Sequence, residues 1–154
     1  MKKKSKILIF LILLILIVAV VINIGKALIP SYEEMYKGSW GFSFPSNLKY
    51  AEIYEKDTGS SFHGDGYRYH VYTYEVEDGI AEMVEWHNTE GHTKYFPSYY
   101  EAVENWLTEI KAEKEQYPIY ENANYYYQWR EDNSELILIW NSQEKKIYIL
   151  ESFM

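Results

Sequence analysis

The sequence predicts an α+β fold in which one N-terminal transmembrane helix precedes a small antiparallel-sheet domain with helices on one face. Three observations lead to this prediction: an apolar run at residues 7–22, several Tyr-, Val- and Ile-rich segments between turn residues, and two helix-start signals. Helical segments set between two groups of strands are typical of an α+β domain. We therefore divide the chain into a basic cytoplasmic tail with its anchor, residues 1–30, and a single exported domain, residues 31–154.

The anchor is predicted from length and polarity. Residues 7–22 carry no polar side chain, and the largely apolar stretch continues to residue 29. A bilayer core of about 30 Å needs about 20 helical residues. Four lysines precede the stretch and only Lys26 follows it closely, so the positive-inside bias keeps the N-terminus cytoplasmic. We expect a single-pass cell-membrane protein, a signal-anchor type, with an extracytoplasmic C-terminal domain. A signal peptide cleaved after Ala27 is the alternative, although its apolar part is usually only about 7–15 residues.

The charge is distributed unevenly along the chain. All 23 acidic residues follow Pro30, whereas five of the 15 basic residues precede it, so residues 31–154 carry ten bases against 23 acids, a net charge of −13. Such a charge favours a basic protein partner or cations and disfavours nucleic acid. A purely solubilising role is the alternative. With no cysteine in the chain, disulfides are excluded, and we expect the aromatic residues to supply the packing.

The first elements of the domain are marked by local signals. Ser31 and Glu34 have the spacing of a capping box, which predicts a short helix over residues 32–37. Strands are predicted over residues 48–55 and 67–76, the second one rich in Tyr, Val and Thr and bounded by glycines. The segment between them is predicted to be a loop.

The second half alternates helical and strand patterns. Apolar side chains at residues 80, 83 and 84 and His87 follow helical spacing and predict a short helix. A capping box at Ser98 and Glu101 predicts a longer helix that ends near Pro118, since the residue before proline avoids helical geometry. A β-meander is predicted over residues 125–130, 136–140 and 147–151, with the middle segment as the central strand because it is apolar on both faces.

The most distinctive string is D-T-G-S-S-F-H-G-D-G at residues 57–66. Asp57, His63 and Asp65 supply two carboxylates and an imidazole, a set that could converge on a divalent cation, and glycines allow close backbone approach. These three residues are the candidate metal ligands. A glycine-rich turn, with Asp65 bonding its own backbone, is the alternative. No other cofactor is predicted.

This string resembles one found in a group of small, uncharacterised membrane- or lipid-anchored proteins of Gram-positive bacteria, which carry a D-T-H-G-G-F-H-G-D-G-like loop. Asp57, Thr58 and residues 62–66 match it. Gly59 stands where that loop has its first histidine, and serines at 60 and 61 replace two glycines. The resemblance implies an anchored location and a strand–loop–strand fold with a C-terminal hairpin, and it implies no activity.

Other catalytic patterns are missing from the sequence. There is no G-x-S-x-G elbow, no cysteine nucleophile and no phosphate-binding glycine loop. Clustered tyrosines at 67–74 and 125–127 could form a contact platform, although a tyrosine-rich core is the favoured interpretation. The sequence therefore favours a non-catalytic, membrane-tethered domain that binds a protein or envelope partner, such as an immunity or accessory protein that captures a basic protein. The alternative is a metal- or small-ligand-dependent enzyme built on the 57–66 loop.

Overall fold

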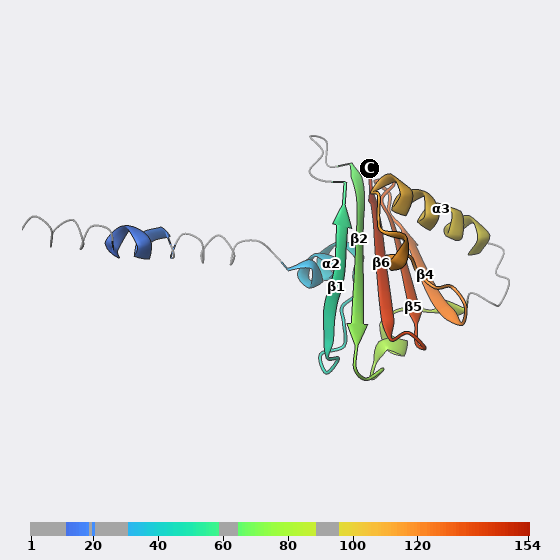
Figure 1. Ribbon diagram of the computed structural model, residues 1–154. Coiled ribbons are helices and arrows are strands. Elements are labelled where there is room, and N and C mark those ends of the chain that lie inside the picture. The colour runs from blue at the N-terminus through green and yellow to red at the C-terminus, as the bar shows by residue number, and fades with distance from the viewer. Residues whose placement is uncertain (1–11, 19, 21–30, 59–64, 89–95) are drawn as a thin grey trace, which may run out of the picture. The chain divides into compact units, whose positions relative to one another are not determined.

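The computed structural model describes residues 12–18, 20, 31–58, 65–88 and 96–154. The chain forms two compact units, residues 1–41 and 42–154, and the β-sheet lies wholly in the second. The predicted α+β class is confirmed, because one antiparallel sheet and separate helices make up the described chain (Figure 1).

The predicted transmembrane helix is wrong. Among the residues that the structure describes, no helix is both long and apolar enough to cross a membrane. Within residues 1–30 the described residues, 12–18 and 20, are helical. The rest of the predicted anchor, including Ala27, lies outside the described residues. The signal-anchor interpretation, the single-pass topology and the cell-membrane location all depended on that helix and are corrected with it.

In the first unit, helix α2 (Tyr32–Trp40) begins at the predicted capping box. The Ser31 hydroxyl accepts a hydrogen bond from the Glu34 amide at 3.3 Å, and the Glu34 carboxylate accepts one from the Ser31 amide at 2.9 Å. The helix runs past Gly38 and ends at Gly41, whose φ of 75° suits a residue without a side chain. The predicted start is therefore confirmed, and the predicted end is three residues early.

The sheet contains six antiparallel strands in the order β1-β2-β6-β5-β4-β3. The last strand of the chain completes the meander and also pairs with the second strand of the first hairpin. The strands are β1 (Tyr50–Asp57), β2 (Gly66–Tyr74), β3 (His87–Asn88), β4 (Ala123–Trp129), β5 (Glu135–Asn141) and β6 (Lys146–Phe153). The predicted meander is confirmed as β4, β5 and β6, and β5 lies inside the sheet with six of its seven residues buried.

One face of the sheet, here called the α3 face, is covered by helix α3 (Phe96–Glu109) (Figure 1). Apolar residues of α3 and the turn after it pack with side chains of β2, β4, β5 and β6 in one buried cluster: Tyr69, Val71, Val103, Trp106, Leu107, Ile110, Ala123, Tyr125, Ile137, Ile139, Tyr148 and Leu150. Burial of apolar area on this scale is the main favourable contribution to folding.

Because side chains alternate along a strand, His70, Tyr72 and Tyr74 of β2 point to the opposite side, here called the far face. That face is also buried at these positions. Phe44 stacks on Tyr50, with ring centroids 4.4 Å apart, and meets Tyr72 edge-on at 5.0 Å. The segment that leads into β1 therefore covers part of the far face.

The predictions for the next two helical segments also differ from the structure. The helix predicted from residue 80 is a single 3₁₀ turn, η1 (Ile80–Glu82), followed by β3 at His87. The Trp86 indole donates to the Ile80 carbonyl at 2.8 Å, a contact that folds the segment back on itself. Helix α3 ends at Glu109, well before Pro118, and a second 3₁₀ turn, η2 (Lys114–Gln116), follows it.

Candidate functional site

The predicted metal ligands of the 57–66 loop are only partly described. Asp57 is the last residue of β1 and lies opposite Arg68 in the ladder, and Asp65 immediately precedes β2. His63 lies outside the described residues. The convergent group of potential ligands found among the described residues includes neither Asp57 nor Asp65. The proposal of a metal at this loop therefore stays a prediction.

The base of that loop is closed by a tight backbone arrangement. Thr58 and Tyr67 exchange two bonds: the Thr58 amide donates to the Tyr67 carbonyl at 3.0 Å, and the Tyr67 amide donates to the Thr58 hydroxyl at 3.1 Å. A Cβ on Gly66, whose φ is 154°, would lie 2.1 Å from that hydroxyl. Gly66 is thus required by the Thr58 contact. A depression of about 300 Å³ beside it is lined by Thr58, Asp65, Gly66, Tyr67, Glu109, Ser152, Phe153 and Met154.

Strand β1 contains a β-bulge at Ile53. Glu52 pairs with Tyr72 and Tyr54 pairs with Val71, so Ile53 is the extra residue, and it is 47% exposed. In a regular strand, residues 52 and 55 would point to opposite faces. The bulge shifts the alternation by one, so that both glutamates share a face.

That shared face is the far face of His70. Glu52 pairs with Tyr72, and Glu55 pairs directly with His70 in the ladder. The His70 Nδ1 atom and a Glu52 carboxylate oxygen are in hydrogen-bond contact. One ligand atom from each of Glu52, Glu55 and His70 lies within 4.8 Å of the other two. His70 is fully buried, whereas the Glu52 side chain is 33% exposed, so the cluster has a buried floor and a side open to water.

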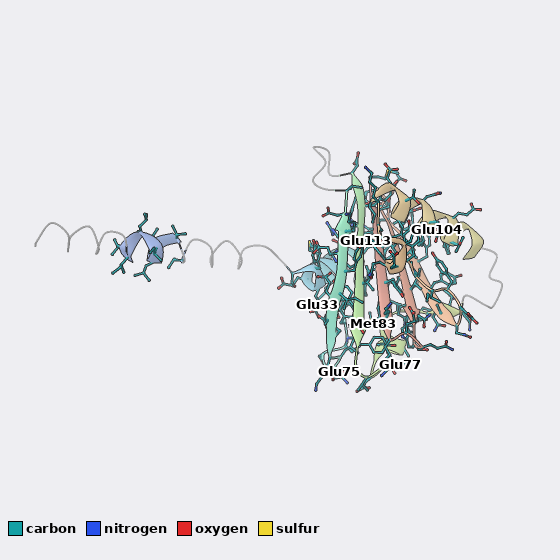
Figure 2. The ribbon with its side chains drawn as sticks, viewed as in Figure 1. Glu33, Glu75, Glu77, Met83, Glu104 and Glu113 are labelled. Atoms are coloured by element: carbon teal, nitrogen blue, oxygen red, sulfur yellow. The ribbon has the colours of Figure 1, made fainter. Side chains whose placement is uncertain are left out.

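The second feature is an acidic segment, defined as residues 75–85, between β2 and β3. Its five carboxylates are all exposed and belong to Glu75, Glu77, Asp78, Glu82 and Glu85. Figure 2 shows Glu75 and Glu77 at the end of the sheet where β2 finishes, apart from Glu104 and Glu113. The Lys145 ammonium donates a hydrogen bond to the Glu75 carbonyl at 3.1 Å, at the start of this segment.

The acidic segment is held in a defined shape. Ile80 is fully buried at its centre, the Asn47 amide donates to the Asp78 carboxylate, and the Glu82 amide donates to the Gly79 carbonyl at 3.2 Å. Val76, 67% exposed, lies between Glu75 and Glu77 in the sequence. The segment therefore presents exposed negative charge and an exposed apolar side chain on a fixed backbone.

The clustered tyrosines serve mainly as core. Tyr69, Tyr72, Tyr74 and Tyr125 are each at most 5% exposed. Burial raises the pKa of the Tyr69 hydroxyl far above its ordinary value, and burial also raises the pKa of Tyr74. Buried rings do not make an open contact platform, so the structure supports the core interpretation for these four residues.

No protein-family model matches the chain, and neither a curated protein nor a solved structure shows significant similarity to it. The resemblance of the 57–66 string to the group of anchored Gram-positive proteins therefore remains a prediction. What the chain does has to be argued from its own residues.

Sequence reasoning did not find the Glu52, Glu55 and His70 cluster. The signal it used, regular alternation along a strand, places the two glutamates on opposite faces. A regular strand would place Tyr50 and Tyr54 on one face and Ala51 and Ile53 on the other. That pattern does not predict a bulge.

Proposed function

We propose that this chain is a non-catalytic binding protein that recognises a basic protein partner. The observation that carries the proposal is the charge of residues 31–154, ten bases against 23 acids, a net charge of −13. A field of this sign accelerates encounters with positively charged surfaces and rejects acidic ones.

The acidic segment is the surface best suited to that partner. Its five exposed carboxylates supply the attraction, and exposed Val76 supplies an apolar contact in the same segment. Buried Ile80 and the bond between Asn47 and Asp78 order the segment in advance. Less conformational entropy is then lost on binding, which favours affinity. A partner that presents lysines or arginines around a small apolar side chain would complement this surface.

The experiment measures binding of the full chain to a synthetic amphipathic peptide of alternating lysine and leucine. Peptides with glutamate or glutamine in place of lysine are the controls, and each titration is done at about 50 and 300 mM salt. We expect binding of the lysine peptide alone, weakened at the higher salt because screening shortens the range of the attraction.

Two triple variants with the same change of charge locate the surface. Glu75→Gln/Glu77→Gln/Glu82→Gln neutralises the acidic segment, and Glu101→Gln/Glu109→Gln/Glu115→Gln neutralises three exposed acids elsewhere. We expect the first to weaken peptide binding by about tenfold and the second by less than about threefold. Equal losses in the two variants, or binding that does not distinguish the lysine from the glutamine peptide, would overturn the proposal.

A further inference from the structure

We propose that Glu52, Glu55 and His70 form a binding site for a divalent transition-metal ion of the zinc or manganese type. This site is distinct from the loop ligands predicted from the sequence, and it goes beyond recognition of a basic partner.

The first argument is the placement of like charges. The bulge at Ile53 brings the Glu52 and Glu55 carboxylates to one face, against the side chain of His70. Two carboxylates close together repel each other, and the repulsion grows where a buried neighbour lowers the local dielectric. A cation between them turns this repulsion into attraction for both. A divalent metal supplies two positive charges to this pair of carboxylates.

The second argument is geometry. The three ligand atoms already lie within 4.8 Å of one another. Ligand bonds to zinc are about 2.0–2.2 Å long, which places neighbouring ligand atoms roughly 3–4 Å apart. The required closure is small, and the two glutamate side chains, each with three rotatable torsions, can supply it. The strand backbones stay fixed, because Glu52 and Glu55 both pair with β2.

The third argument is the kind of ligand. One imidazole nitrogen and two carboxylate oxygens suit zinc and manganese, whereas magnesium and calcium favour sites made of oxygen alone. His70 is fully buried, and its ring stacks with Tyr72 at 6.1 Å between centroids. Its orientation is therefore fixed before any metal arrives. The exposed part of Glu52 leaves one side of the cluster open, where water would complete the coordination shell.

The test uses the full chain, freed of metal by a chelator and titrated with Zn²⁺ or Mn²⁺, and with Mg²⁺ or Ca²⁺ for comparison. We expect one Zn²⁺ or Mn²⁺ ion per chain. At a concentration of about 100 times the Kd, the melting temperature should rise by about 5 °C or more. Mg²⁺ and Ca²⁺ should leave it within about 1 °C.

Variants separate this site from loose attraction to an acidic surface. Glu52→Gln and Glu55→Gln each keep the side-chain shape and should weaken Zn²⁺ binding by on the order of tenfold or more. The control Glu109→Gln removes an exposed acid of α3 and should change binding by less than about twofold. A loss in the control as large as in the other two would mean that only surface attraction is present, and it would overturn the proposal.

A spectroscopic readout reports on His70 without replacing it, since substitution of a fully buried residue could prevent folding. Mn²⁺ is paramagnetic and broadens the NMR signals of nearby nuclei. At substoichiometric Mn²⁺ we expect the His70 imidazole signals to disappear before those of His87, an exposed residue on β3. Equal broadening of the two histidines, or no effect on His70, would overturn the assignment.

Discussion

Arg68 and Glu151 form an ion pair across β2 and β6, in which the Arg68 Nη1 atom lies 3.1 Å from the Glu151 carboxylate. The two residues are direct partners in the ladder, and the Glu151 side chain is only 2% exposed, whereas that of Arg68 is 24% exposed. The guanidinium also lies 4.8 Å from the centre of the Phe153 ring. A nearly buried carboxylate is therefore paired with an arginine that keeps contact with water.

Substitution of Arg68 should destabilise the fold more than substitution of Glu151. Arg68→Met keeps the apolar stem but leaves Glu151 as a buried charge, and we expect it to lower the free energy of unfolding by about 2–3 kcal/mol. Glu151→Gln leaves a side-chain carbonyl that can still accept a hydrogen bond from Arg68, so we expect a loss of about 1 kcal/mol. Urea unfolding of both variants and of the double variant measures the coupling. Equal losses would contradict the asymmetry.

A second prediction concerns the hydrogen bond between Trp140 and Tyr74 on the far face. The Trp140 indole donates to the Tyr74 hydroxyl at 2.9 Å, and both residues are buried. Tyr74→Phe removes the acceptor and leaves a buried N–H, so we expect a loss of about 1–2 kcal/mol in the free energy of unfolding. Tyr126→Phe, which removes the half-buried bond to Gln128, is the control and should cost less than about 0.5 kcal/mol. A control that costs as much as Tyr74→Phe would show that the bond itself is not the cause.

The third prediction is a loss of stability at high pH. Burial raises the pKa of Tyr69 and Tyr148 above the ordinary tyrosine value of 10.0, and the Glu144 carboxylate beside Tyr148 raises its pKa further. Below pH 10 both hydroxyls are protonated in the folded and unfolded chains, so they do not make the free energy of unfolding depend on pH. Above pH 10 the unfolded chain releases these protons and the folded chain retains them, which favours unfolding. Each tyrosine then lowers the free energy of unfolding by up to about 1.4 kcal/mol per pH unit.

This prediction is checked by urea unfolding at intervals from pH 8 to pH 11.5, with tyrosine ionisation followed by absorbance. Above pH 10, Tyr148→Phe should make the fall of the unfolding free energy with pH less steep by up to about 1.4 kcal/mol per pH unit, which corresponds to one proton. Below pH 9 it should leave the pH dependence unchanged. A free energy of unfolding that stays constant up to pH 11.5 would contradict the assignment of these hydroxyls as buried and protonated.

Local chemistry explains which parts of the fold the sequence could predict. The capping box at Ser31 and the meander of β4, β5 and β6 depend on neighbouring residues and on alternation, and both are present as expected. The end of α3 could not be found this way. The chain turns at Lys111, whose φ of 55° is left-handed. Glycine usually occupies this position after a helix and so marks its end in the sequence, but here the residue is a lysine.

Tertiary contacts explain the other differences. The helical spacing of residues 80–87 is overridden by the bond from Trp86 to the Ile80 carbonyl and by the tilted contact of Trp86 with Trp140, 5.4 Å between ring centroids. The first contact folds the segment back on itself, and the second draws it toward the sheet. The candidate metal cluster was missed for a related reason, because a bulge is selected by the pairing of β1 with β2 and leaves no strong local signature.

The bulge leads to a fourth prediction, that deletion of Ile53 leaves the fold intact. Glu52 pairs with Tyr72 and Tyr54 pairs with Val71, which are consecutive partners on β2, so removal of Ile53 makes β1 a regular strand and preserves every cross-strand pair. Glu52 and Glu55 would stay on the far face. We expect the free energy of unfolding to change by less than about 1.5 kcal/mol, mainly through the altered twist.

Deletion of Ala51, an exposed residue in the regular part of the same strand, is the matched control. Any new register must either turn Tyr50 away from Phe44 or carry Glu52 to the opposite face, since a shift by one residue reverses every side chain that it moves. We therefore expect this deletion to be the more destabilising by at least about 1 kcal/mol. Urea unfolding of the two deletion variants decides the matter. If deletion of Ile53 were as damaging as deletion of Ala51, Ile53 would be a required part of the strand rather than an inserted residue.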